Sequence, residues 1–104
     1  MVDFKHLKIL QLANNKFKGS INSLPKHVEI VQLARNEFNG IIRINFEDAL
    51  SLKEFNGDYN YFVGTIPTSI AMLKKLETCE LFFIFYSILV LMYLLNYDKS
   101  FIEK

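Results

Sequence analysis

The chain of 104 residues has one cysteine, two prolines, four glycines and no tryptophan. Its single cysteine, Cys79, excludes an internal disulfide and a cysteine-based zinc cage. A net charge of only +1 gives no broad field for nucleic acid or an acidic substrate. The first residues lack the apolar core of a secretion signal. The sequence also lacks a glycine-rich phosphate loop, a Gly-x-Ser-x-Gly elbow and the protein-kinase signatures. We therefore expect no enzyme activity, no cofactor and no nucleic-acid partner.

What the sequence does contain is a tandem repeat. Residues 5–21 (KHLKILQLANNKFKGSI) align without a gap on residues 26–42 (KHVEIVQLARNEFNGII), with 10 of 17 positions identical. A third copy begins at Leu52, and its Asn60 follows Asn36 by 24 residues. Each unit reads L-x-x-L-x-L-x-x-N-x-F-x-G-x-I. A repeat of this period indicates units that cannot bury their apolar face alone and that stack to form one continuous core.

The pattern within one unit predicts its local structure. Leu10 and Leu12 alternate with a polar residue, which is typical of a short, half-buried strand. Asn15 follows where the chain must turn, and a buried amide there can satisfy backbone groups that the turn leaves unpaired. Phe17 is expected to fill the interior, and Gly19 permits a tight backbone path. By repetition the residues with a structural role are Asn15, Asn36, Asn60, Gly19, Gly40 and Gly64.

These units resemble the leucine-rich repeat family, and the Gly-x-Ile-Pro ending at residues 64–67 is similar to its plant-specific class of receptor-like kinases and receptor-like proteins. The resemblance implies an α/β fold: a solenoid of about three coils over residues 1–78, with short parallel strands on a concave face. It implies a second, convex-side strand from Gly-x-Ile-Pro. The sequence departs from the family pattern at Gly57, which replaces a strand Leu and should weaken core contact. A fourth unit begins at residue 73 and stops where Leu81 stands in the Asn position.

The outward strand positions are the candidate binding surface. They form columns across the units, which we expect to bind a peptide or protein ligand, or a co-receptor, as the resemblance implies. The candidate ligand-binding residues are Gln11, Asn14, Gln32, Arg35, Asn56, Asp58 and Tyr59. The amide column suits an extended peptide backbone, and Arg and Tyr are enriched at interface hot spots. The alternative is that these are solvated strand positions without a ligand.

The two histidines, His6 and His27, share one register of the repeat, so adjacent units should stack them. No third ligand repeats with them, whereas zinc sites use three or four protein ligands. We therefore expect no metal site.

The composition changes after residue 78. Residues 79–97 are almost entirely apolar and predict a C-terminal helix, whereas residues 98–104 form a polar tail. The uncharged run 81–97 is at the short end of what spans a bilayer, about 17–20 residues. Three interpretations stay open: a single-pass membrane anchor, a buried or aggregation-prone helix, and the translated non-coding end of a truncated gene.

Three functions follow from these alternatives. The first is a non-catalytic binding module at the plasma membrane, resembling part of a plant receptor ectodomain. The second is a small membrane-anchored repeat protein with a structural role. The third is a fragment with no independent function, because a solenoid of three units without caps leaves apolar ends exposed.

Overall fold

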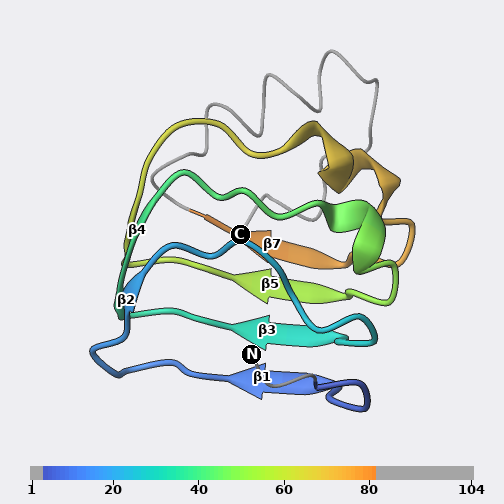
Figure 1. Ribbon diagram of the computed structural model, residues 1–104, viewed down its shortest axis with the longest axis horizontal. Helices are drawn as coiled ribbons and strands as arrows, with labels where there is room; N and C mark the ends of the chain where they lie inside the picture. The colour runs from blue at the N-terminus through green and yellow to red at the C-terminus, as the bar shows by residue number, and fades with distance from the viewer. Residues whose placement is uncertain (1–3, 82–104) are drawn as a thin grey trace.

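The computed structural model describes residues 4–81. Two parallel sheets run through them, and Figure 1 shows the strands of the first sheet lying side by side. The first sheet has the order β1-β3-β5-β7 and the second has the order β2-β4-β6. The strands are β1 (Ile9–Gln11), β2 (Lys18–Gly19), β3 (Ile30–Gln32), β4 (Glu37–Gly40), β5 (Glu54–Asn56), β6 (Tyr61–Phe62) and β7 (Thr78–Glu80). This arrangement agrees with the predicted α/β class in outline.

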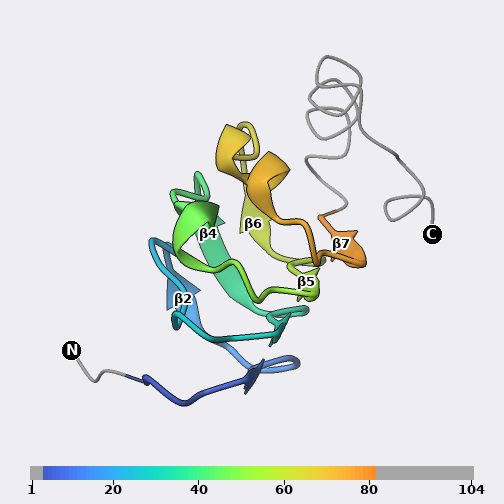
Figure 2. The same cartoon turned by 90° about the vertical axis from the view of Figure 1, so that its right-hand side faces the viewer.

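The connections that return the chain to the first sheet differ in length. The second carries the 3-10 helix η1 (Phe46–Asp48), and the third carries the 3-10 helix η2 (Thr68–Met72). Figure 2 shows η1 and η2 next to each other, and a bond of 2.9 Å from the backbone N–H of Phe46 to the Ser69 hydroxyl joins the two connections. The first connection, residues 20–29, has no helix. It is also the shorter one, because Asn15 and Asn36 are 21 residues apart whereas Asn36 and Asn60 are 24 apart.

The strands pair in the register that the repeat predicts. Gln11 pairs with Gln32, and Gln32 pairs with Asn56. Alternation along each strand sends Val31 and Phe55 inward, where each is 1% exposed, and leaves the amide side chains on the outer face. The buried apolar residues of the core begin at Val28 and continue to Leu81. At the N-terminal end, where β1 has no neighbour among the described residues, Leu10 is only partly buried.

Asparagine side chains join neighbouring units. The Asn36 amide nitrogen donates to the carbonyl oxygens of Leu12 (2.8 Å) and Leu33 (3.1 Å), and its oxygen accepts the N–H of Phe17 at 3.1 Å. Asn60 repeats this set one unit later, and both residues are buried. Asn15 was expected to be buried as well, which is wrong. It is exposed and bonds only within its own unit, because no described strand lies before β1.

The glycine and phenylalanine positions of the repeat behave alike in each unit. Gly19, Gly40 and Gly64 all have positive φ, between 77° and 99°, a conformation that glycine adopts without steric cost. The rings of Phe17, Phe38 and Phe62 form a stack with centroid separations of 6.2 and 6.3 Å. Phe38 and Phe62 lie in the core as predicted, but Phe17 is 45% exposed because it ends the stack.

The fourth unit continues further than the sequence predicted. Its strand β7 pairs with β5, and Asn56 lies opposite Glu80. Leu81 therefore occupies the position of Gly57, not the Asn position, which falls at residue 84 of the sequence. The predicted domain boundary after residue 78 lies inside this strand.

Gly57 was expected to weaken the core contact of its strand, and it does not. A Cβ atom on Gly57 would lie 2.6 Å from Cδ2 of Leu81 and 3.1 Å from Cε2 of Phe62. The side chain of the following unit thus fills the space that a strand Leu would take. Leu81 itself is 4% exposed, so the first residue of the apolar run belongs to this core.

The second sheet is displaced from its expected place. Its strands lie around the Phe-x-Gly part of each unit and end at Gly19, Gly40 and Phe62, so they extend no further than the glycine of the Gly-x-Ile segment. Nothing among residues 4–81 is a helix long and apolar enough to cross a bilayer. The predicted apolar helix, apart from its first residues, and the polar tail 98–104 lie outside the described residues.

Candidate binding surface

We use the term strand face for the outward side chains of the first sheet and of the residues that follow its strands. Paired registers place these residues in three columns: Ile9, Ile30, Glu54 and Thr78; Gln11, Gln32, Asn56 and Glu80; Ala13, Ala34 and Asp58. A fourth column beside them contains Asn14, Arg35 and Tyr59. The structure therefore brings the seven candidate ligand-binding residues of the sequence together on one surface.

The amide column is oriented by its own backbone. The side-chain oxygen of Gln11 accepts the N–H of Ala13 at 3.0 Å, and that of Gln32 accepts the N–H of Ala34 at 3.2 Å. Asn56 does the same with Asp58 at 3.0 Å. Because each oxygen is held in this way, the amide nitrogens point away from the turn. Those of Gln11 and Gln32 have no hydrogen-bond partner within the described part of the chain, so the strand face offers fixed donors to a ligand.

The fourth column has an unusual backbone. Asn14, Arg35 and Tyr59 have φ values of 61°, 61° and 57°. Asn tolerates this left-handed conformation, whereas Arg and Tyr rarely adopt it. The guanidinium carbon of Arg35 lies 4.3 Å from the centroid of the Tyr59 ring, a cation–π contact between two exposed side chains. The turn geometry and this contact together fix a flat cationic pair at one border of the strand face.

Charge is distributed unevenly over the strand face. In the first three columns, β1, β3 and the residues just after them contribute Ile, Gln and Ala only, whereas Arg35, which follows β3, lies in the fourth column. Strands β5 and β7 contribute the carboxylates of Glu54 and Glu80, and Asp58 follows β5. The Glu80 carboxylate accepts a hydrogen bond of 3.0 Å from the Asn56 amide, which holds it on the face. The first three columns are thus uncharged over β1 and β3 and acidic over β5 and β7, and Arg35 is the one cation in the fourth column of the described residues.

The opposite border carries a ladder of alternating charge. Glu29 lies between Lys8 and Lys53, with nitrogen–oxygen distances of 3.9 and 3.3 Å. These exposed pairs contribute little stability, in the range of about 0–1 kcal/mol each. They do neutralise Glu29, so the acidic character of the strand face comes from β5 and β7 rather than from its border.

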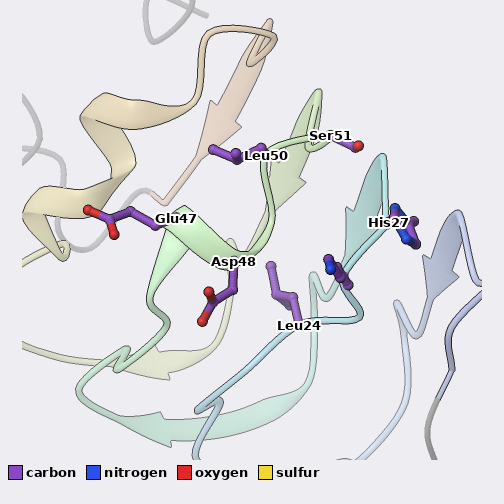
Figure 3. Close-up of a pocket in the computed structure, with 7 residues that line it drawn as sticks. Leu24, His27, Glu47, Asp48, Leu50 and Ser51 are labelled. Carbon is purple, nitrogen blue, oxygen red and sulfur yellow. The ribbon is translucent and has the colours of Figure 1, made fainter.

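An open pocket of about 460 Å³ lies between the first and second connections. Figure 3 shows its lining on both sides: Leu24, Lys26 and His27 from the shorter connection, and Glu47, Asp48, Leu50 and Ser51 from η1 and the loop after it. The hollow lies beside the first connection, which is three residues shorter than the second. Its charged side chains are all exposed, so it presents no desolvated group to a ligand.

Chemistry on the described residues is limited. Burial raises the pKa of the Cys79 thiol from 9.0 to about 12, and the charges of Asp58 and Glu80 add to the effect. The thiol is therefore protonated at neutral pH and is a poor nucleophile. Residues 4–81 contain no cluster of three His, Cys, Asp or Glu side chains that could hold a metal ion. His6 and His27 both lie in exposed turns.

Two residues of the strand face, Thr78 and Glu80, were missed at the sequence level. They were not predicted because the fourth unit was expected to end before forming a strand, with Leu81 in the Asn position. Their signal was the 24-residue spacing, which relates Glu54 to Thr78 and Asn56 to Glu80 in the same way as it relates Asn36 to Asn60. The strand at Thr78 and Glu80 is hard to recognise in the sequence because Cys79 stands where the other units have Leu, Val or Phe.

No protein-family model matches the sequence, and no curated protein gives a significant match.

Proposed function

We propose that this chain is a non-catalytic binding module that takes an extended peptide or a protein segment on the strand face. We further propose that it is a short solenoid of the leucine-rich-repeat type, in which the strand face is the concave side. Its setting would be that of a receptor ectodomain fragment at the plasma membrane, with a peptide, a protein or a co-receptor as partner.

One observation supports this function above the others: the outward amides are held in register, and those of Gln11 and Gln32 present donors that are unpaired among residues 4–81. Gln11 and Gln32 each bond their oxygen to the backbone two residues later, so their nitrogens stay available without a loss of side-chain entropy on binding. Solvated positions chosen only for solubility have no need of such preorganisation. The pocket beside η1 offers no comparable feature.

The experiment is a selection of twelve-residue peptides from a random display library against the full chain. Selected peptides are then measured against a variant with alanine at Gln11, Gln32, Asn56 and Tyr59. Loss of the two available donors of Gln11 and Gln32, of the Asn56 amide that holds Glu80, and of one aromatic ring should weaken binding at least tenfold, since each such contact contributes about 0.5–1.5 kcal/mol.

The matched control places alanine at Glu47, Asp48 and Ser51, on the pocket side. That variant should bind as the unchanged chain does, and circular dichroism should show both variants folded. If the four strand-face alanines leave the affinity unchanged, or if no peptide is enriched at all, the proposed function is wrong.

A further inference from the structure

We infer that the ligand of the strand face is an extended peptide segment with one basic side chain and one apolar side chain three residues before or after it. The basic side chain would lie over β5 and β7, and the apolar one over β1 and β3. This inference rests on the proposed function and adds the chemistry of the partner.

The acidic half supplies the charge complementarity. Glu54 and Glu80 lie on adjacent strands, in neighbouring columns of the strand face. No Lys or Arg of residues 4–81 forms an ion pair with either carboxylate. The nearest cation in the columns, Arg35, stacks on the Tyr59 ring instead. An incoming Lys or Arg would therefore meet two partly buried carboxylates that have no cationic partner among residues 4–81.

The neutral half suits an apolar side chain. Ile9 is 57% exposed, and Ile30 next to it is only half-buried. The adjacent column holds Gln11 and Gln32, whose side-chain oxygens are bonded to the backbone, and the small residues Ala13 and Ala34 lie beyond it. Between the two halves, the Gln32 amide nitrogen can donate to a ligand carbonyl.

The spacing of the sheet sets the spacing in the ligand. The midpoints of the two halves are two strand separations apart, about 10 Å. A polyproline-type segment places residues i and i+3 on one face about 9 Å apart, whereas a flat β-strand places residues i and i+2 about 7 Å apart. An extended peptide that crosses the strands therefore reaches both halves with residues three positions apart.

The test reads the composition of the selected twelve-residue peptides. The expected result is enrichment of Lys or Arg with Leu, Ile, Val or Phe three positions away. One synthetic peptide of this type and its matched partner, with Gln in place of the basic residue, are then measured against the full chain and the double variant Glu54→Gln, Glu80→Gln. The double variant should lower the affinity of the basic peptide about five- to tenfold and leave that of the Gln peptide within twofold.

The matched control, Glu47→Gln with Asp48→Asn, removes two negative charges away from the strand face and should change neither affinity. Gln at position 80 keeps an oxygen for the Asn56 amide, so the double variant retains that contact. Enrichment of neutral or acidic peptides that depend on the four strand-face residues would overturn the inference and leave the proposed function standing. Failure to enrich any peptide would overturn both.

Discussion

Replacing Asn36 by alanine should destabilise the chain by about 3 kcal/mol. The substitution removes three contacts donated to the carbonyls of Leu12, Leu33 and, at 3.4 Å, Ala34. It also removes one bond accepted from the N–H of Phe17. Asn36 is only 6% exposed, so water cannot easily replace these bonds. Each hydrogen bond contributes roughly 1 kcal/mol net, and a buried partner left unpaired costs about 1–3 kcal/mol. A loss of this size is a large part of the stability of a small domain.

The assay is urea unfolding followed by circular dichroism, with Asn15→Ala as the matched control. Asn15 is exposed, and its two bonds, of 3.0 and 3.1 Å, stay within its own unit. Water can replace them, so this variant should lose less than about 1 kcal/mol. Equal losses in the two variants would refute the argument that the asparagines stabilise the chain by joining neighbouring units.

Three further predictions concern the core. Gly57→Leu restores the repeat pattern but should destabilise the chain by about 1–3 kcal/mol, because Leu81 and Phe62 already fill the space beside Gly57. Urea unfolding measures this loss, and a gain in stability would contradict the packing. Gly40→Ala should lower the free energy of unfolding by about 1–2 kcal/mol from backbone strain alone, since the φ of Gly40 is 77° and no atom lies within 4 Å of an added Cβ. An unchanged unfolding midpoint would argue against this strain. Burial raises the pKa of the Cys79 thiol to about 12, so its contribution to stability is complete below pH 9 and is lost as the pH rises towards 12. Unfolding midpoints at pH 8 and 10.5 should therefore fall more for the unchanged chain than for Cys79→Ala, and equal falls would count against a buried neutral thiol.

Much of the fold could be predicted from the repeat because its signals are local. The alternation at Leu10 and Leu12 predicted the strand β1, and the fixed 21- and 24-residue spacings predicted its parallel register with β3 and β5. Gly19 was expected to permit a tight backbone path, and it has a positive φ in the structure, as do Gly40 and Gly64. Residue type and spacing determine these features without reference to distant contacts.

What could not be predicted depends on neighbours in space. Burial of Asn36 but not Asn15 follows from which units have a neighbour on both sides. The tight environment of Gly57 comes from Leu81, 24 residues later in the sequence, where no pattern within one unit could reveal it. The left-handed backbone at Arg35 and Tyr59 could not be predicted from the sequence, because these residue types seldom adopt that conformation.

Only the placement of the candidate residues could be predicted from the sequence. The seven residues were chosen from the period of the repeat and do lie on one surface. Their hydrogen-bonded orientation, and the division of the face into a neutral and an acidic half, required the side-chain contacts of β5 and β7.

Chemical-shift mapping of the labelled full chain with a selected peptide tests the central claim most directly. We predict that the largest shifts fall on the backbone and side-chain amides of Gln11, Gln32 and Asn56, with small shifts at Glu47 and Ser51. Shifts concentrated at the pocket beside η1, with the amide column unmoved, would contradict the assignment of the strand face as the binding surface.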